Sequence, residues 1–263
     1  MRMAQDCRLV HLDVSLRHLQ TEVLHYREID STNAALLQPH KYPSGTVLMA
    51  DYQSAGRGRL GRTWSAPAGE ALLFSIFLET DLADPLYIYT FLAAVAVREA
   101  LAHFIPGNGL TLKWPNDILL NDRKICGILV QSVTTGTSLR IVIGIGLNLN
   151  QSAAFFEPAL PHASSLYVET GQRFERLPVL RAILLAIDNN LNIPLARRPD
   201  EILRKWQAAC TSLGKRVKVN DGQAVYTGLF TGLTPQGGLI LQIEERRIVF
   251  HAADVTIVKE KPL

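Results

Sequence analysis

Cysteine is scarce in this sequence, and its scarcity argues against two kinds of stabilised fold. Three cysteines occur among 263 residues: Cys7, Cys126 and Cys210. They are odd in number and widely spaced, without a Cys-x-x-Cys pair or a Cys/His cluster, so we expect neither a disulfide framework nor a zinc site. Free thiols persist in a reducing compartment, and the expected location is therefore the cytoplasm.

The chain also lacks a large excess of positive or negative charge. The chain has 27 Lys and Arg residues against 24 Asp and Glu residues, a formal net charge of +3. A dedicated DNA-binding protein is expected to carry a dense basic patch or a recognition motif, and neither is visible. We therefore expect no DNA partner.

Long hydrophobic runs are missing as well. The longest apolar stretches, Phe91–Val97 and Ile183–Ile187, are much shorter than the roughly 20 residues that a membrane-spanning helix needs. The first residues, which include Arg8 and Asp13, contain no apolar signal core. The hydrophobic content of 48% suits a substantial core, so the sequence predicts a soluble globular protein without a membrane partner.

Apolar segments joined by turns predict the secondary structure of most of the chain, although the residues before Asp30 are weakly patterned. Strands are expected at Thr46–Ala50, Leu72–Leu78, Asp117–Leu120, Lys124–Ser132 and Leu139–Ile145, and helices at Ala34–Leu37, Pro85–His103, Leu177–Leu191 and Pro199–Cys210. Successive strands joined by tight turns favour a largely antiparallel sheet over βαβ repeats.

After Gly214 the sequence pattern changes to short apolar segments separated by turns. Five short strands are expected at Arg216–Val219, Ala224–Phe230, Leu239–Ile243, Arg247–Phe250 and Val255–Val258. Short strands separated by turns such as Asn220–Gly222 are typical of a small all-β barrel. We place a boundary near Ser212, which divides the chain into domains 1–211 and 212–263.

The loop Gly56–Arg62 contains three glycines and three arginines. It formally matches the dinucleotide-binding pattern G-x-G-x-x-G, but that motif must open a helix, and Pro67 and Gly69 would break one here. Glycines expose backbone N–H groups and guanidinium groups bind carboxylate or phosphate, so the loop suits an anionic ligand. The alternative is a mobile basic surface loop that touches RNA.

Two further segments carry lysine beside potential ligand groups. The segment Lys113–Asp117 has two interpretations. It either forms a turn after a buried tryptophan, or it places a lysine and a carboxylate beside an anionic ligand. Asp117 can orient a lysine or hold Mg²⁺ that bridges phosphates. Lys124 precedes an apolar strand, where it is either a solvated strand end or an inward point charge for an anion. Cys126 on that strand is interpreted as a small core residue because no His partner is evident.

The segment Gly144–Asn150 ends another strand with two glycines. These glycines form a bulge, or they leave room for a flat ligand with Asn148 as a polar contact.

Taken in order, five segments resemble the biotin–protein ligase family: Asp30–Asn33, Gln53–Arg62, Lys113–Asp117, Lys124 with Gly127–Leu129, and Gly144–Asn148. Each segment alone is a weak or moderate signal, but their ordered combination is highly specific. The resemblance implies an α+β fold: a mixed, largely antiparallel sheet flanked by helices, like that of class II synthetases, followed by an SH3-like C-terminal domain.

The resemblance also implies the reaction and its participants. Biotin attacks the α-phosphate of MgATP to give biotinyl-5′-AMP, and a lysine of a biotin carboxyl carrier protein then attacks this anhydride. The implied substrates are biotin and ATP with Mg²⁺. Family members include monomers and homodimers that pair through the central sheet, and no residue here decides between these states.

The family pattern assigns roles to individual residues. Lys124, Arg59 and Asp117 are the expected catalytic residues, with Asp117 also a possible Mg²⁺ ligand. The expected biotin- and adenylate-binding residues are Ser31, Thr32, Asn33, Gln53, Gly56, Arg57, Gly58, Arg59, Trp64, Lys113, Asn116, Lys124, Gly127, Ile128, Gly144, Gly146 and Asn148.

Three features depart from the family pattern. Cys126 stands where the family usually has glycine or alanine. Gln131 replaces a frequent glutamate, and we assign it no role. Some relatives carry an N-terminal winged-helix domain that represses biotin genes, but too few residues precede Ser31 to hold one, so we do not expect repression.

Two alternatives remain at this stage. A lipoate–protein ligase shares the fold and the adenylate chemistry, but lipoyl members of the family lack this Gly-Arg-Gly-Arg loop. A non-catalytic nucleic-acid- or protein-binding module would use the barrel and the basic loop. Such a module has no need of Lys124 and Asp117 beside the loop.

Overall fold

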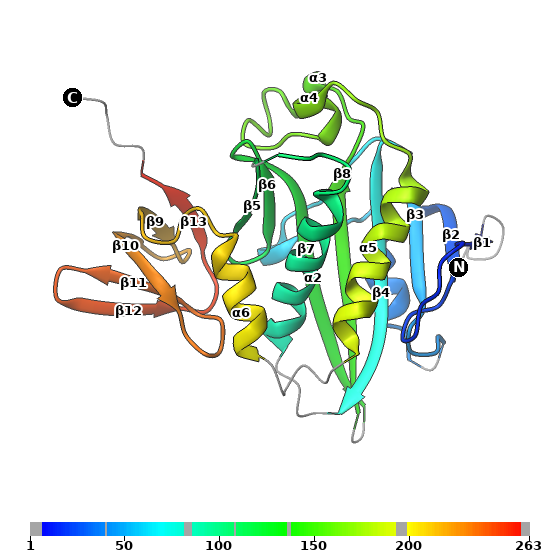
Figure 1. Ribbon diagram of the computed structural model, residues 1–263, viewed down its shortest axis with the longest axis horizontal. Helices are drawn as coiled ribbons and strands as arrows, with labels where there is room; N and C mark the ends of the chain where they lie inside the picture. Colours follow the sequence, from blue (N-terminus) through cyan, green and yellow to red (C-terminus); the bar gives the residue numbers. More distant parts are fainter. Residues whose placement is uncertain are drawn as a thin grey trace.

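Figure 1 presents the computed structural model of the protein, which describes residues 7–39, 41–81, 86–107, 109–135, 138–192 and 199–258. An eight-stranded sheet forms its centre, in the order β1-β2-β3-β4-β8-β7-β6-β5. The strands are β1 (Cys7–His11), β2 (Glu22–Ile29), β3 (Val47–Gln53), β4 (Ala71–Asp81), β5 (Leu110–Lys113), β6 (Asp117–Leu120), β7 (Arg123–Thr135) and β8 (Ser138–Asn148). The β2–β3 pair is parallel, and the other neighbouring pairs are antiparallel.

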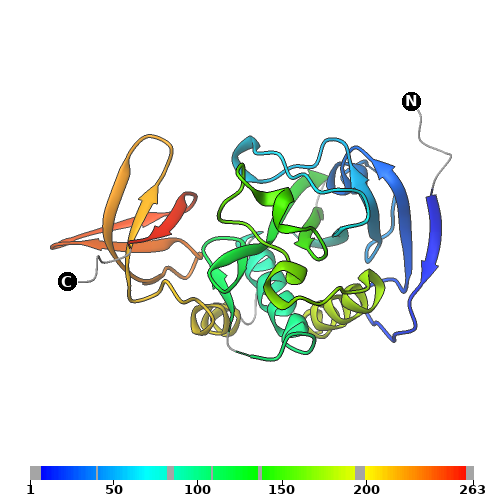
Figure 2. The same cartoon turned by 90° about the horizontal axis from the view of Figure 1, so that it is seen from above.

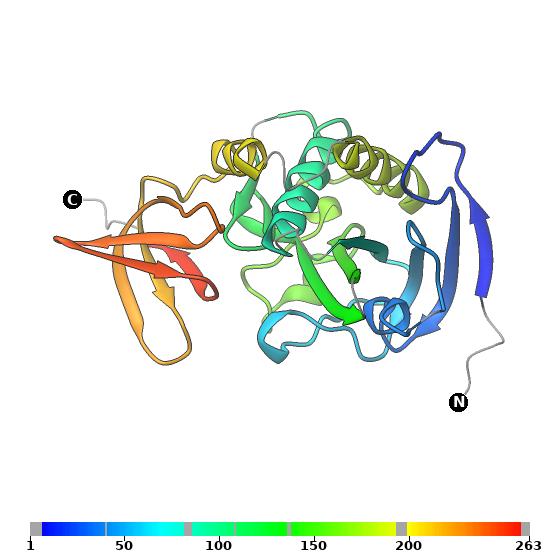
Figure 3. The ribbon, with the colours of Figure 1, turned by 90° about the horizontal axis from the view of Figure 1, so that it is seen from below.

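Helices cover both faces of the central strands. α2 (Leu86–Leu101) and α5 (Arg176–Leu191) pack on one face, where Phe74 and Ile143 belong to the main core. α1 (Thr32–Leu36) lies on the opposite face over Leu48 and Phe77, as Figures 2 and 3 show from two sides. Strands covered on both faces carry nearly continuous apolar side chains, which explains why the apolar runs of β4 and β8 were recognisable in the sequence.

A second sheet follows α6 (Pro199–Ala208) and lies at the opposite end of the molecule from β1 (Figure 1). Its order is β12-β11-β10-β9-β13, and its described pairs are antiparallel. The strands are β9 (Arg216–Asn220), β10 (Val225–Leu233), β11 (Leu239–Ile243), β12 (Arg246–Phe250) and β13 (Asp254–Ile257). The five strands expected after Gly214 are therefore present, and the alternating burial of β9 matches a sheet with one covered face.

Several elements escaped prediction from the sequence. These are β1, β2, β5 and two short helices, α3 (Ala153–Phe156) and α4 (Leu166–Thr170). β1 is an edge strand whose residues are mostly exposed, so its sequence has no hydrophobic alternation. α3 and α4 are about one turn long, which is too short for a helical period to be visible in the sequence. Pro85, the expected start of the second helix, lies outside the described residues.

The division of the chain at residue 212 stays a prediction. The residues before it contact the large sheet, since the Leu112 N–H donates to the Ala209 carbonyl at 2.9 Å. The second sheet begins at Arg216. Within the described ranges, no helix combines the length and the apolar character needed to cross a membrane.

A buried carboxylate on α5 fixes the segment between β1 and β2. Asp188 is 2% exposed, and its two oxygens accept the backbone N–H groups of Arg17, His18 and Leu19 at 2.8–2.9 Å. An ionised carboxylate with three such donors replaces the water that these groups lose on burial.

Asp188→Asn should lower the free energy of unfolding by roughly 2 kcal/mol, because at least one N–H group loses its ionised acceptor. Urea unfolding measures this change. Glu245→Gln, in an exposed turn, is the matched control and should leave the midpoint unchanged. Equal midpoints for the two variants would contradict the assigned role of Asp188.

Candidate active site

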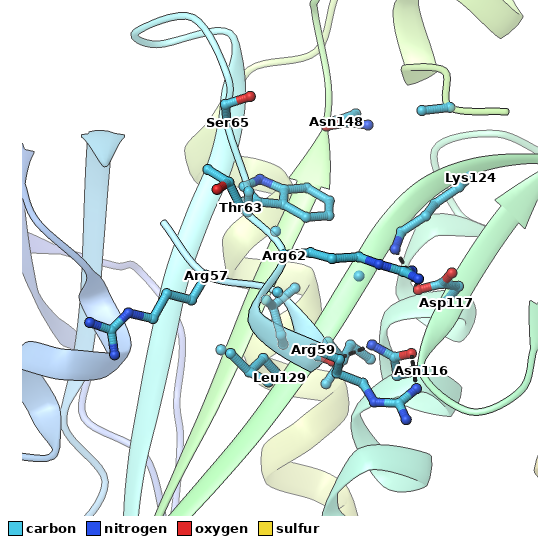
Figure 4. Close-up of a pocket in the computed structure, with 18 of the residues that line it drawn as sticks. Arg57, Arg59, Arg62, Thr63, Ser65, Asn116, Asp117, Lys124, Leu129 and Asn148 are labelled. Carbon is cyan, nitrogen blue, oxygen red and sulfur yellow. Dashed lines mark hydrogen bonds and ion pairs between the residues drawn. The ribbon is translucent and has the colours of Figure 1, made fainter. Parts of the chain in front are cut away.

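A cavity of about 330 Å³ lies between the Gly56–Arg62 loop and the large sheet, with part of its wall from the C-terminal sheet. Every residue that the family pattern assigns to the site lines this cavity except Gly56. The segments expected to carry chemistry, which are far apart in the sequence, therefore meet at one place (Figure 4).

Gly56 has a different position from the one expected. It is buried at the base of the loop, and a Cβ atom there would lie 2.3 Å from the Trp64 carbonyl oxygen. Glycine is needed at this position of the motif because the backbones of Gly56 and Trp64 pack closely. The Trp64 N–H also donates to the Gly56 carbonyl at 3.0 Å.

The N-terminal end of α1 forms a rigid polar corner of the cavity. The Thr32 N–H and Oγ1 both donate to Gln53 Oε1, at 2.7 and 3.0 Å. Ser31 caps the helix, its Oγ accepting the Ala34 N–H at 3.4 Å. Ser75 Oγ lies 2.6 Å from Thr32 Oγ1 and supports the corner from beneath. This corner presents fixed donors and acceptors to a polar, uncharged ligand group.

Asn33 is occupied by contacts within the protein. Its Nδ2 donates to the Leu129 carbonyl at 3.1 Å and to Gln131 Oε1 at 2.9 Å. A Cβ at Gly144 would lie 2.1 Å from Asn33 Oδ1, so that glycine makes room for the Asn33 side chain. Gln131, to which the sequence assigned no role, thus helps to hold Asn33.

A lysine–carboxylate pair lies at the opposite end of the cavity. Lys124 Nζ is 2.6 Å from Asp117 Oδ1, and the two side chains face each other in Figure 4. The antiparallel register places Lys113 and Gly127 opposite Asp117 on its two neighbouring strands. Sheet pairing therefore brings the Lys-Trp-Pro-Asn-Asp segment beside Lys124, the second residue of β7.

The three loop arginines have different surroundings. Arg59 Nη1 donates to Asn116 Oδ1 at 3.2 Å, and burial lowers the pKa of its guanidinium while Asp117 and Asp254 act in the opposite direction. Arg57 is exposed and points to the side of the loop away from Lys124 (Figure 4). Arg62 pairs with Asp254, and hydrogen bonding to that carboxylate raises the pKa of Arg62.

Residues of the C-terminal sheet complete the cavity wall, and the sequence did not predict them. Ala253, Asp254 and Val255 line the cavity. Two hydrogen bonds also tie the turn between β10 and β11 to the larger part of the molecule: Trp114 Nε1, just after β5, donates to the Gly237 carbonyl at 2.9 Å, and Tyr87 Oη, on α2, donates to the Pro235 carbonyl at 2.5 Å. No local pattern around Asp254 signals this role, because the contact arises only when the second sheet docks.

Trp64 lies against the glycines of β7 and β8. A Cβ at Gly146 would come within 2.5 Å of the indole ring, and one at Gly127 within 2.9 Å. Lys124 Nζ lies 5.6 Å from the centre of the ring. Of the two glycines that the sequence offered as a bulge or as room for a flat ligand, Gly146 thus receives the flat indole of the protein itself in this conformation, and Gly144 receives the Asn33 side chain.

Cys126 is outside the cavity lining and fully buried. Burial raises the pKa of its thiol far above the ordinary value, which fits a core residue and not a nucleophile.

The cavity has an excess of positive charge. Five cationic side chains line it, namely Arg57, Arg59, Arg62, Lys113 and Lys124, against the carboxylates of Asp117 and Asp254. With the polar corner at one end, the arrangement suits a ligand that is uncharged at one end and anionic in the middle.

Comparisons with known proteins agree with this geometry. Residues 26–148 match the model of the biotin/lipoate A/B protein ligase family, and residues 212–258 match the biotin protein ligase C-terminal domain. The chain is 35% identical to the biotin–[acetyl-CoA-carboxylase] ligase of Paracoccus denitrificans, covering 86% of this chain and 96% of that protein. It is 32% identical to the enzyme of the same name from Mycobacterium tuberculosis, covering 86% and 85%.

Among solved structures, the biotin protein ligase from Aquifex aeolicus in complex with biotin and ATP superposes with a TM-score of 0.76 at 30% identity. The match covers 90% of this chain and 99% of that chain. The expected α+β fold with a mixed sheet and an SH3-like C-terminal domain is confirmed by this likeness and by the C-terminal family match.

The contact between Trp64 and Gly146 is testable by fluorescence. Gly146→Ala should displace the indole toward solvent and shift tryptophan emission to longer wavelength, because Trp114 and Trp206 stay buried at 2% and 0% exposure. Gly232→Ala is the matched control, since its Cβ would meet nothing closer than 3.8 Å. Identical spectra for Gly146→Ala and the unaltered protein would refute this packing.

Proposed function

Since the chain belongs to the biotin/lipoate A/B protein ligase family, we propose that it is a biotin–protein ligase that forms biotinyl-5′-AMP and transfers biotin to a carrier lysine. The observation that carries this proposal is that one cavity is lined by five cationic side chains, by the Lys124–Asp117 pair and by the polar corner of Ser31, Thr32 and Gln53. Two anions must meet in adenylate formation, and fixed cations offset their repulsion.

In the first step a carboxylate oxygen of biotin attacks the α-phosphorus of ATP. The bond from that phosphorus to the oxygen that bridges the β-phosphate breaks, and pyrophosphate leaves. Lys124 and Arg59 stabilise the negative charge that develops at the α-phosphate. Asp117 fixes the direction of the Lys124 side chain through the 2.6 Å contact between Oδ1 and Nζ.

The polar corner suits the ureido ring of biotin, which needs both donors and acceptors. Gln53 Oε1 is held by Thr32, which leaves the Gln53 amide nitrogen and the Ser31 hydroxyl for a ligand. Trp64, Gly127, Ile128 and Gly146 form the wall along which the valeryl chain would run, once the indole moves off the glycines. Lys113, Asn116 and Asn148 are assigned to the nucleotide side of the cavity.

Mg²⁺ enters with ATP in this proposal. Across the described residues no three His, Cys, Asp or Glu side chains converge, so phosphate oxygens would supply most of the ligands. Asp117 is the candidate protein ligand, because Mg²⁺ at nucleotide sites is commonly held by one or two carboxylates.

In the second step the neutral ε-amine of a carrier lysine attacks the carbonyl carbon of the anhydride, AMP leaves with the electrons of the C–O bond that breaks, and the nitrogen releases one proton to solvent as the amide forms. The carrier is a biotin carboxyl carrier protein of a biotin-dependent carboxylase, which is supported by the name of the relatives, biotin–[acetyl-CoA-carboxylase] ligase. Residues 1–211 would form the catalytic domain and residues 212–263 the SH3-like domain, with Asp254 of the latter closing the cavity through Arg62. ATP and free thiols both suit the cytoplasm.

Biotin is favoured over lipoate as the substrate. The C-terminal sheet matches a domain model of biotin protein ligases, and the Gly-Arg-Gly-Arg loop is present and lines the cavity.

Biotin with ATP should raise the melting temperature more than either ligand alone, because the adenylate stays bound to the folded protein. Ligand at about 100 times its Kd adds about 2.7 kcal/mol to the free energy of unfolding. Lipoate with ATP is the control and should produce no such gain. A larger shift with lipoate, or none with biotin, would overturn the proposed substrate.

Lys124→Ala should slow biotin-dependent release of pyrophosphate by about 100-fold or more, because the α-phosphate loses a fixed cation. The affinity for biotin alone should change little, since the polar corner is intact. Lys205→Ala, on α6 outside the cavity lining, is the control and should retain the full rate. An unaltered rate for Lys124→Ala would exclude the assigned role.

A further inference from the structure

Glu169 is a nearly buried carboxylate that does not line the cavity. Its side chain is 9% exposed, and it lies on α4, the short helix after the segment that carries Phe155, Phe156 and Ala163 into the cavity. The segment 152–165 is called the covering segment below.

The carboxylate of Glu169 joins two separate parts of the chain. Ser164 Oγ, in the covering segment, donates to Glu169 Oε1 at 2.5 Å. Asn121 Nδ2, in the turn between β6 and β7, donates to Glu169 Oε2 at 2.9 Å. Arg123 Nη1 lies 3.8 Å from Glu169 Oε1 and neutralises its charge. These contacts satisfy both oxygens of a carboxylate that is largely removed from water.

The same two parts are joined directly at Lys124. The Lys124 N–H donates to the His162 carbonyl, and the Ser164 N–H donates to the Lys124 carbonyl, both at 2.8 Å. Arg123 Nη2 donates to the Ala163 carbonyl at 2.9 Å. The backbone of Lys124 is therefore held between β6 and the covering segment, and any shift of that segment moves the lysine.

The covering segment also reaches the end of β8. Asn148 Nδ2 donates to the Ser164 carbonyl at 2.9 Å, and Gln151 Nε2 donates to Asn148 Oδ1 at 2.8 Å. Phe155, Phe156 and Ala163 form an aromatic and apolar part of the wall of the cavity that Asn148 and Lys124 also line, and the backbone of Ala163 pairs with that of Lys124. Among the described residues, no hydrogen bond or ion pair joins the polar corner of Ser31, Thr32 and Gln53 to this network.

We propose that Glu169 is a positioning residue for the nucleotide half of the site. It fixes the covering segment against the β6–β7 turn, so that the wall of Phe155, Phe156 and Ala163, where this proposal places the adenine ring, and the ammonium group of Lys124 are set as one unit. This inference rests on the proposed ligase function and adds the residue that places its nucleotide-binding wall. Glu169 touches neither substrate, and its effect passes through Ser164 and Arg123.

Glu169→Gln tests the inference because it preserves size and removes the charge that pairs with Arg123. In a biotin-dependent pyrophosphate-release assay, its KM for ATP should rise about tenfold, the equivalent of about 1.4 kcal/mol. Its KM for biotin, and the affinity for biotin measured without ATP, should stay within about twofold. A carboxylate that only supports folding would not produce this separation between the two substrates.

Asp188→Asn is the matched control, since it also removes the charge of a buried carboxylate that accepts several hydrogen bonds. It should lower stability without changing either KM. Equal effects of Glu169→Gln on ATP and biotin, or an unchanged KM for ATP, would overturn the proposed role.

Ser164→Ala provides an independent variant if Glu169→Gln does not fold. It removes the contact between Glu169 and the covering segment while the Glu169–Arg123 pair remains, so it should give the same separation with a smaller rise in KM for ATP. An unchanged KM for ATP would count against the inference. Absence of biotin-dependent pyrophosphate release in the unaltered protein would instead contradict the proposed function itself, which keeps the two failures distinct.

Discussion

The mutual repulsion of cationic side chains is the constraint around which this site is built. Arg57, Arg59, Arg62, Lys113 and Lys124 line one cavity. Asp117 holds Lys124, and Asp254 holds Arg62, so the two carboxylates offset part of the repulsion before any ligand enters. Arg59, which is partly buried, has a neutral partner in Asn116. An anionic ligand in the cavity would supply the missing counter-charge.

The same two ion pairs connect the site to the architecture. The Lys124–Asp117 pair spans β6 and β7, whose register places Asp117 opposite Gly127. The Arg62–Asp254 pair spans the loop and the second sheet. The C-terminal sheet is thus part of the cavity wall, and Trp114 and Tyr87 anchor it through hydrogen bonds to Gly237 and Pro235.

Close packing explains why glycine recurs around the cavity. Gly144 accommodates the Asn33 side chain, and Gly127 and Gly146 accommodate the indole of Trp64. Removing a Cβ atom at these positions lets side chains from the opposite face of the cavity approach the sheet directly. When a ligand takes the place of the indole, the loop that carries Trp64 has to move, which agrees with a loop that is mostly exposed and rich in glycine.

Several properties could be predicted from the sequence because they depend on local order. The apolar runs of β4, β7 and β8 identified central strands, and the ordered motifs identified the family and, with it, about half of the residues that line the cavity. The tertiary structure alone decided the rest. Asp254 is part of the site because the second sheet docks there, and Gly56 lies outside the cavity wall because Trp64 packs over it. Glu169 accepts a hydrogen bond from Asn121, which lies in a turn 48 residues away in the sequence. Motifs record which groups the chemistry needs, whereas contacts between distant segments depend on how the sheets and helices pack.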